Sequence, residues 1–233
     1  MSLSSLTGTI IVLAVLAFCC TGSTLADSLP GGVHREAIEW TDIWIADGSG
    51  TALPRVLLIG DSITRQYYPN VSQLLSGQAS VSRYCTSACI ADPSFIDGLI
   101  PTLKSYRWKI IQFNNGMHGW DYTEDEYRKA YPRAIEAIQK YAPGAIIVIA
   151  STTPTDSADT KSTANPQTDR IVVRNQAAAA VAAANHFPVD DVFTTAYGHP
   201  ECFDSGGIHF NPTGIGVLAA RVTASITPML AKQ

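Results

Sequence analysis

The chain has 233 residues and a formal net charge of −4, from 16 Lys and Arg against 20 Asp and Glu. No cluster of basic residues interrupts this acidic balance, which argues against nucleic acid as a partner. The cysteines follow no common zinc-ligand spacing, so the sequence does not indicate a structural zinc site.

Residues 1–26 differ in kind from the rest because they carry no charged side chain and contain a short apolar run. The run is shorter than the roughly 20 residues that span a bilayer and is typical of a secretory signal. We therefore expect a signal peptide over 1–26, export to the cell exterior or the periplasm, and no stable membrane association afterwards. An uncleaved anchor is one alternative. A lipoprotein acylated at Cys19 or Cys20 is another, which the bulky Phe18 disfavours.

Residues 27–233 alternate short apolar runs with longer helix-like segments, as in a single α/β domain. The runs are rich in Val and Ile, which is typical of parallel strands buried on both faces. We expect strands over residues 55–60, 79–84, 108–113, 145–151 and 187–193.

Helices are expected between these strands and after the last one. The final helix should begin at Asn211 as N-cap, followed by Pro212 in the first helical position. A long polar loop, 151–169, follows the fourth strand. The pattern predicts a doubly wound parallel sheet. The expected helices cover residues 94–106, 124–142, 169–187 and 211–230.

The stretch "RVLLIGDSI" leaves the first strand and at once presents Asp61 and Ser62. A serine at such a turn exposes its hydroxyl, and its N–H at a helix N-terminus can stabilise an oxyanion. Ordinary helix capping is the alternative for both residues. A serine nucleophile needs a base, and His209 precedes the last helix at the edge of the sheet where ligands bind.

Two blocks, "IGDSI" (59–63) and "GGIHFNPTG" (206–214), resemble the first and last blocks of the SGNH/GDSL hydrolase superfamily. The resemblance implies a flavodoxin-like three-layer sandwich with a five-stranded parallel sheet. It also implies ester hydrolysis with Ser62 as nucleophile and His209 as base, without a metal or an organic cofactor.

The resemblance further implies an oxyanion hole made of the Ser62 N–H, a glycine N–H and an asparagine side chain. Asn115 in "FNNGMHG" is the expected side-chain donor. Asn114 is the alternative, and a simple Asn-Gly turn is the non-catalytic interpretation.

The oxyanion glycine of the family has no counterpart in "YCTSACIADPSF" (84–95). Any backbone N–H can serve in its place, so one of Ser87, Ala88 and Cys89 should replace it. We expect Ala88 to do so.

The family's triad aspartate also departs from the usual pattern, because Gly206 stands three residues before His209. Asp204 is the nearest carboxylate, and we expect it to orient the imidazole. A backbone carbonyl, giving a Ser–His dyad, and a carboxylate from a distant loop are the alternatives.

Asp61, Asn114, His118 and Trp120 are expected to line the substrate site. Trp120 and the nearby Tyr122 could stack on a sugar ring, with core packing as the alternative for either aromatic residue.

An oxidising compartment permits one disulfide among the three cysteines that follow the signal segment. Cys89 and Cys202 are the expected pair, with Cys85 as the alternative partner of Cys202.

Together these features predict a secreted serine esterase that removes small acyl groups, acetyl above all, from a small-molecule or glycan ester. The reaction would pass through an acyl-enzyme intermediate. A lipase or thioesterase acting on longer acyl chains is the enzymatic alternative. A non-catalytic glycan-binding module on the same fold is the other.

Overall fold

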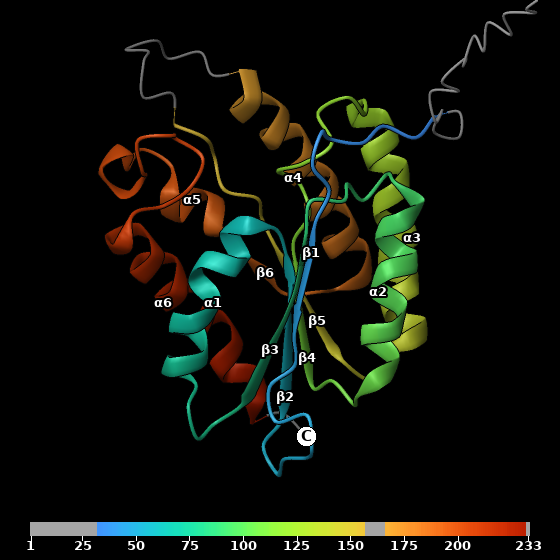
Figure 1. Cartoon of the computed structure of the whole chain (residues 1–233), viewed down its shortest axis with the longest axis vertical. Coiled ribbons are helices and arrows are strands. Elements are labelled where there is room, and N and C mark those ends of the chain that lie inside the picture. Colours follow the sequence, from blue (N-terminus) through green and yellow to red (C-terminus); the bar gives the residue numbers. More distant parts are fainter. Residues whose placement is uncertain (1–31, 157–165, 232–233) are drawn as a thin grey trace, which may run out of the picture. The chain divides into compact units, whose positions relative to one another are not determined.

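The computed structural model describes residues 32–156 and 166–231, so the expected signal peptide over 1–26 lies outside the described residues. In Figure 1 a central sheet stands between two layers of helices. Within the described part the sheet has six strands in the order β1-β3-β2-β4-β5-β6. The strands are β1 (Thr41–Trp44), β2 (Arg55–Gly60), β3 (Ser80–Thr86), β4 (Ile110–Phe113), β5 (Ile146–Ala150) and β6 (Val189–Asp190).

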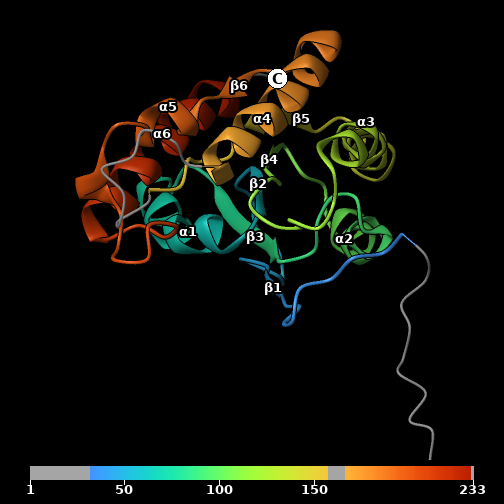
Figure 2. The same cartoon turned by 90° about the horizontal axis from the view of Figure 1, so that it is seen from above.

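Three longer helices pack on one face of the sheet and two on the other, as the view from above shows (Figure 2). One layer holds α2 (Pro93–Ser105), α3 (Glu124–Tyr141) and α4 (Pro166–Asn185), and the other holds α1 (Ser62–Leu74) and α6 (Pro212–Leu230). The short helix α5 (Val192–Ala196) and a 3₁₀ turn, η1 (Pro200–Cys202), lie between β6 and α6 in the chain.

The buried side chains of β2 alternate between two hydrophobic cores. Leu57 and Ile59 face the core under α2 and α3, whereas Val56 and Leu58 face the core under α1 and α6. This alternation follows from the two-residue period of a strand. After Arg55 at its start, β2 carries no polar side chain, and the next ones, Asp61 and Ser62, come directly after its end.

All five expected strands are present and parallel to one another, and their order is the flavodoxin-like one. The sheet differs from the expectation by one strand, β1, which pairs antiparallel with β3 at the edge. β1 has four residues, none of them buried. A run so short and so exposed carries no hydrophobic pattern that could have predicted it.

The expected strand over 187–193 is much shorter than predicted. Only Val189–Asp190 is a strand, because the Asp191 carboxylate accepts a hydrogen bond from the Thr194 N–H at 3.1 Å and caps a helix there. Residues 187–188 precede the strand, and residues 192–193 form the start of α5.

The expected Cys89–Cys202 disulfide is wrong, because both cysteines and Cys85 are free thiols. Cys89 lies in the core under α2 and α3, and Cys202 lies in the core under α1 and α6. The sheet therefore separates the two sulfur atoms. Burial raises the pKa of Cys89 to about 11, so this thiol is protonated and unreactive near neutral pH.

Candidate functional site

The serine turn joins β2 to α1 and is held by contacts within a few residues. Asp61 is the N-cap of α1, and its buried carboxylate accepts a hydrogen bond from the Ile63 N–H at 2.9 Å. Gly60 is required because a Cβ atom there would lie 2.0 Å from the Thr64 hydroxyl oxygen. Ser62 follows as the first residue of α1, with its side chain half-buried at the end of the sheet.

His209 is brought to Ser62 from the other end of the chain. The Ser62 Oγ and the His209 Nε2 are 2.7 Å apart and share a hydrogen bond across 147 residues of sequence. His209 is half-buried in the loop between η1 and α6. A hydroxyl within hydrogen-bond distance of an imidazole nitrogen is the geometry in which a base activates a serine nucleophile.

Gln66, one turn beyond Ser62 on α1, ties the serine helix to the histidine loop. Its Oε1 accepts a hydrogen bond from the Phe210 N–H at 3.2 Å, and its Nε2 donates to the Phe210 carbonyl at 3.4 Å. Phe210 directly follows His209, so Gln66 fixes the main chain beside the base. Nothing in the sequence pattern marked Gln66, because its partner is 144 residues away.

Asp204 does not reach the histidine ring, although we expected it to orient that ring. Its exposed carboxylate accepts a hydrogen bond from the Gly206 N–H at 2.9 Å, a local turn of the kind that Asp side chains favour. Its main-chain N–H donates to the His209 carbonyl at 2.9 Å. Among the described residues, the His209 ring hydrogen-bonds only to Ser62. Asp204 therefore shapes the loop rather than orienting the ring.

Asn115 reaches across the end of β2, the strand that precedes Ser62. Asn115 follows β4, yet its Oδ1 accepts from the Ile90 N–H and its Nδ2 donates to the Ala88 carbonyl, each at 3.0 Å, in the loop after β3. Because β2 lies between β3 and β4, this contact passes beside the serine turn. Asn114 points away instead, and its Nδ2 donates to the carbonyl of Ala150, the last residue of β5, and to the Thr152 hydroxyl.

Of the three candidate backbone donors in the loop after β3, one is free. The Ser87 N–H donates to the Trp40 carbonyl, and the Ala88 N–H donates to the Thr86 hydroxyl, each at 3.1 Å. The Cys89 N–H has no acceptor among the described residues. The Ala88 N–H, which we expected to bind an oxyanion, is therefore already occupied, and the Cys89 N–H is the one left without an acceptor.

The two aromatic residues expected to stack on a sugar make packing contacts instead. Tyr122 is buried, and its hydroxyl accepts a hydrogen bond from the His34 N–H. The Trp120 ring lies under the guanidinium groups of Arg170 and Arg174, at 5.3 and 4.7 Å from its centroid. Trp120 therefore belongs to the support of the loop rather than to an open sugar platform.

Two arginines of α4 and one glutamate, here called the arginine clamp (Arg170, Arg174 and Glu124), hold the loop that follows Asn115. Both guanidinium groups pair with the Glu124 carboxylate, and the Arg174 side chain is fully buried. Their remaining N–H groups donate to main-chain carbonyls of the loop, which belong to Gly116, His118, Gly119, Trp120 and Tyr122.

His118 lies at the margin of the site, held by the segment that precedes β1. Its Nδ1 is 2.9 Å from a Glu36 carboxylate oxygen, and its ring meets the Trp40 ring edge-on at 6.2 Å between centroids. Its Nε2 is buried and has no partner among the described residues. These contacts leave the expected role of His118 in substrate binding a prediction.

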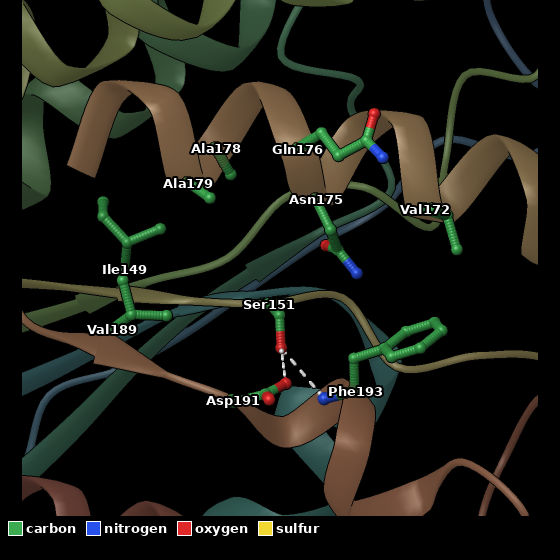
Figure 3. A pocket seen from close by; sticks show the side chains of 10 residues that line it. All are labelled: Ile149, Ser151, Val172, Asn175, Gln176, Ala178, Ala179, Val189, Asp191 and Phe193. Atoms are coloured by element: carbon green, nitrogen blue, oxygen red, sulfur yellow. Dashed lines mark hydrogen bonds between the residues drawn. The ribbon is translucent and has the colours of Figure 1, made fainter. Parts of the chain in front are cut away.

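An apolar cavity lies beyond β5, away from Ser62 (Figure 3). It has a volume of about 330 Å³ and is lined by β5, α4, β6 and α5. Its Ser151 hydroxyl is already bonded to Asp191 and to the Phe193 N–H. Neither Ser62 nor His209 lines it. In the described ranges, no group of three or more His, Cys, Asp or Glu side chains is placed to hold a metal ion.

Residues 58–215 match the family described as the GDSL-like lipase/acylhydrolase family. No curated protein sequence matches the chain. Among solved structures, a GDSL-like lipase from Bacteroides thetaiotaomicron is similar, with a TM-score of 0.61 and 15% identity over 78% of this chain and 94% of that one.

Two further similar structures bear names that mention carbohydrate. A carbohydrate esterase family 3 structure from Talaromyces cellulolyticus has a TM-score of 0.58 and 16% identity, over 78% of this chain and 100% of that chain. An acetyl xylan esterase has a TM-score of 0.59 and 16% identity, over 74% of this chain and 99% of that chain. At these identities the likeness is one of fold.

Proposed function

Because the chain belongs to the GDSL-like lipase/acylhydrolase family, we propose that this esterase is secreted and removes small acyl groups, acetyl above all, from carbohydrate. The observation that carries the proposal is the 2.7 Å hydrogen bond between the Ser62 Oγ and the His209 Nε2. It supports a catalytic protein over a glycan-binding module, because a binding module has no use for an activated serine.

In the proposed mechanism, His209 acts as base in both halves of the reaction. Its Nε2 takes the Ser62 proton as Oγ attacks the ester carbonyl carbon. The tetrahedral intermediate collapses, the C–O bond to the alcohol breaks, and the alcohol leaves with the proton from His209. Water then attacks the acyl-enzyme, His209 takes its proton, and Ser62 regains a proton as the carboxylic acid departs.

Three donors are proposed to hold the oxyanion. The Ser62 N–H lies in the first turn of α1, where helix N–H groups have no partner within the helix. The Cys89 N–H is free among the described residues. The Asn115 amide uses one of its two N–H bonds on the Ala88 carbonyl, which leaves the second for the oxyanion. Losing one such donor typically costs a factor of about 10² to 10³ in kcat.

The acetyl part of the proposal rests on the name of one similar structure, an acetyl xylan esterase. The apolar cavity beyond β5 is the observation that favours the rival, a lipase or thioesterase, if an acyl chain can reach it from Ser62. The names of the two carbohydrate-related neighbours support the sugar part of the proposal.

The export part of the proposal rests on the uncharged segment 1–26 and has its own test. N-terminal sequencing of the protein recovered from the medium or the periplasm should give Asp27 as the first residue. Retention of Met1 in a cell-associated product would reject the cleaved signal without affecting the esterase proposal.

The substrate is tested with p-nitrophenyl esters of two to twelve carbons, beside acetate release from acetylated sugars. We expect kcat/KM to be highest for the acetyl ester and to fall with chain length, with acetate released from the sugars. A preference for eight carbons or more would favour the lipase. No hydrolysis of any ester by the wild type, with the Ser62→Ala variant as blank, would reject the proposed function.

A further inference from the structure

Arg65 lies one turn beyond Ser62 on α1 and has no ionic partner in the part of the chain that the structure describes. Residues three apart on a helix share a face, with Cβ atoms about 5–6 Å apart, so Arg65 leaves the helix beside the nucleophile. Its side chain is exposed. Within the ranges 32–156 and 166–231 it forms no ion pair and no hydrogen bond, and its one recorded contact is with an aromatic ring.

The carboxylates on the segments around the site are already engaged elsewhere. Asp61 caps α1, and Glu36 is paired with the His118 ring. Glu39 accepts a hydrogen bond of 2.6 Å from a serine hydroxyl in the loop after β3. None of these acids forms an ion pair with Arg65, whose positive charge therefore remains available to a ligand.

Trp40 provides a fixed platform for this cation. The Arg65 guanidinium lies 4.7 Å from the centroid of the Trp40 ring. The Trp40 main chain is bonded to Ser87 on both sides, with its N–H on the hydroxyl at 2.9 Å and its carbonyl on the N–H at 3.1 Å. A stacked guanidinium presents its face to the ring and keeps its in-plane N–H groups free.

Resting on the proposed function, we propose that Arg65 on Trp40 is a specificity site that binds a carboxylate on the alcohol part of the ester. The preferred substrate is then an acetyl ester of an acidic sugar, such as a uronate. A planar guanidinium matches a carboxylate with two parallel hydrogen bonds. A local cation is also needed because the chain as a whole carries a formal charge of −4 and repels anions.

The test compares two substrates that differ at one group: an O-acetylated methyl glucuronoside and the matching acetylated methyl glucoside. For the wild type we expect kcat/KM to be at least about tenfold higher for the glucuronoside, since hydrogen bonds to charged groups are the strong ones. Arg65→Gln should bring the ratio close to one. Arg65→Lys keeps the positive charge but cannot form the two parallel hydrogen bonds of a guanidinium, so it should give an intermediate ratio.

Arg133→Gln is the matched control, because Arg133 is an exposed arginine on α3, away from the serine turn. It should leave the ratio at the wild-type value. A wild-type ratio near one, or a ratio that Arg65→Gln does not change, would overturn the inference while leaving the esterase intact. Failure of the wild type to hydrolyse either sugar or p-nitrophenyl acetate would instead overturn the proposed function.

Discussion

The serine turn and the loop after Asn115 lie at the same edge of the sheet but are held in opposite ways. Gly60 and Asp61 fix the serine turn through contacts with residues two to four positions away. The loop after Asn115 is held by the arginine clamp, whose buried Arg174 is bonded to carbonyls 55 to 58 residues away. Replacing the functional side chain of the locally held turn should leave the free energy of unfolding nearly unchanged. Replacing an arginine that holds the loop after Asn115 should lower it.

The strongest test of this difference is Ser62→Ala. Because the turn is held by Gly60 and Asp61, the variant should fold with a free energy of unfolding close to that of the wild type. Turnover should fall by several orders of magnitude, as it does when a serine nucleophile is lost. Steady-state kinetics and urea denaturation measure the two quantities. A variant that loses stability but keeps activity would reverse the expected pattern.

Arg174→Met should destabilise the fold without touching the reacting groups. It leaves the Glu124 carboxylate, and several loop carbonyls, without their buried partner. Breaking a buried ion pair in this way costs about 3–5 kcal/mol. Urea denaturation measures the loss.

Arg170→Met is the control for the clamp, because the Arg170 side chain is 34% exposed and that of Arg174 is 0% exposed. Arg170→Met should lower the free energy of unfolding clearly less than Arg174→Met does. Equal losses for the two variants would show that burial of Arg174 is not what fixes the loop.

Asp190 of β6 is a buried carboxylate held by residues distant in sequence, and it adds a pH dependence. Burial raises its pKa to about 6, although Arg221 and Gln112 both donate to it at 2.7 Å. The unfolded value is about 3.9. A raised pKa means that the stabilising contribution is complete below about pH 4 and is lost as the pH rises to about 6, by roughly 3 kcal/mol.

Asp190→Asn removes this titration. We therefore expect the stability of the variant, relative to the wild type, to be higher at pH 7 than at pH 4. Urea denaturation at the two pH values checks this, and a difference that is constant across the range would show that Asp190 keeps an ordinary pKa in the folded state.

Gln66→Leu tests the link between the serine helix and the histidine loop. Losing both hydrogen bonds to Phe210 should cost about 1 kcal/mol in positioning His209, which is a roughly five- to tenfold fall in kcat with KM little changed. Gln66→Glu keeps the acceptor for the Phe210 N–H and should lose less. Equal kcat values for the wild type and Gln66→Leu would mean that the loop holds His209 without this link.

Asp204→Asn should have the smallest effect. Asparagine can still accept the hydrogen bond from Gly206, and Asp204 makes no contact with the His209 ring. We expect kcat to fall less than about tenfold, against a factor of about 10⁴ when a triad carboxylate is replaced. A 10³-fold loss for Asp204→Asn would contradict the observed geometry.

The features that the sequence predicted are those that depend on local patterns. The five parallel strands follow from runs rich in Val and Ile, and the meeting of Ser62 with His209 follows from two motifs and the rule that places ligands at one edge of the sheet. The N-cap of α6 at Asn211 is confirmed for the same reason, since its side chain bonds to N–H groups two and three residues on.

The features that the sequence did not predict depend on contacts between distant residues. Gln66 and Arg174 have partners that no spacing rule indicates. The predicted disulfide failed because counting thiols says nothing about which face of a sheet each one occupies. The Ala88 expectation failed because its N–H is taken by the Thr86 hydroxyl, a detail of one turn.

The measurement that tests the central claim most directly is the site at which a fluorophosphonate labels the protein. The account predicts one covalent adduct, located by mass spectrometry on Ser62, absent from Ser62→Ala and formed much more slowly in His209→Ala, because His209 removes the Ser62 proton. An adduct on another residue, or labelling of Ser62 at the wild-type rate without His209, would contradict it.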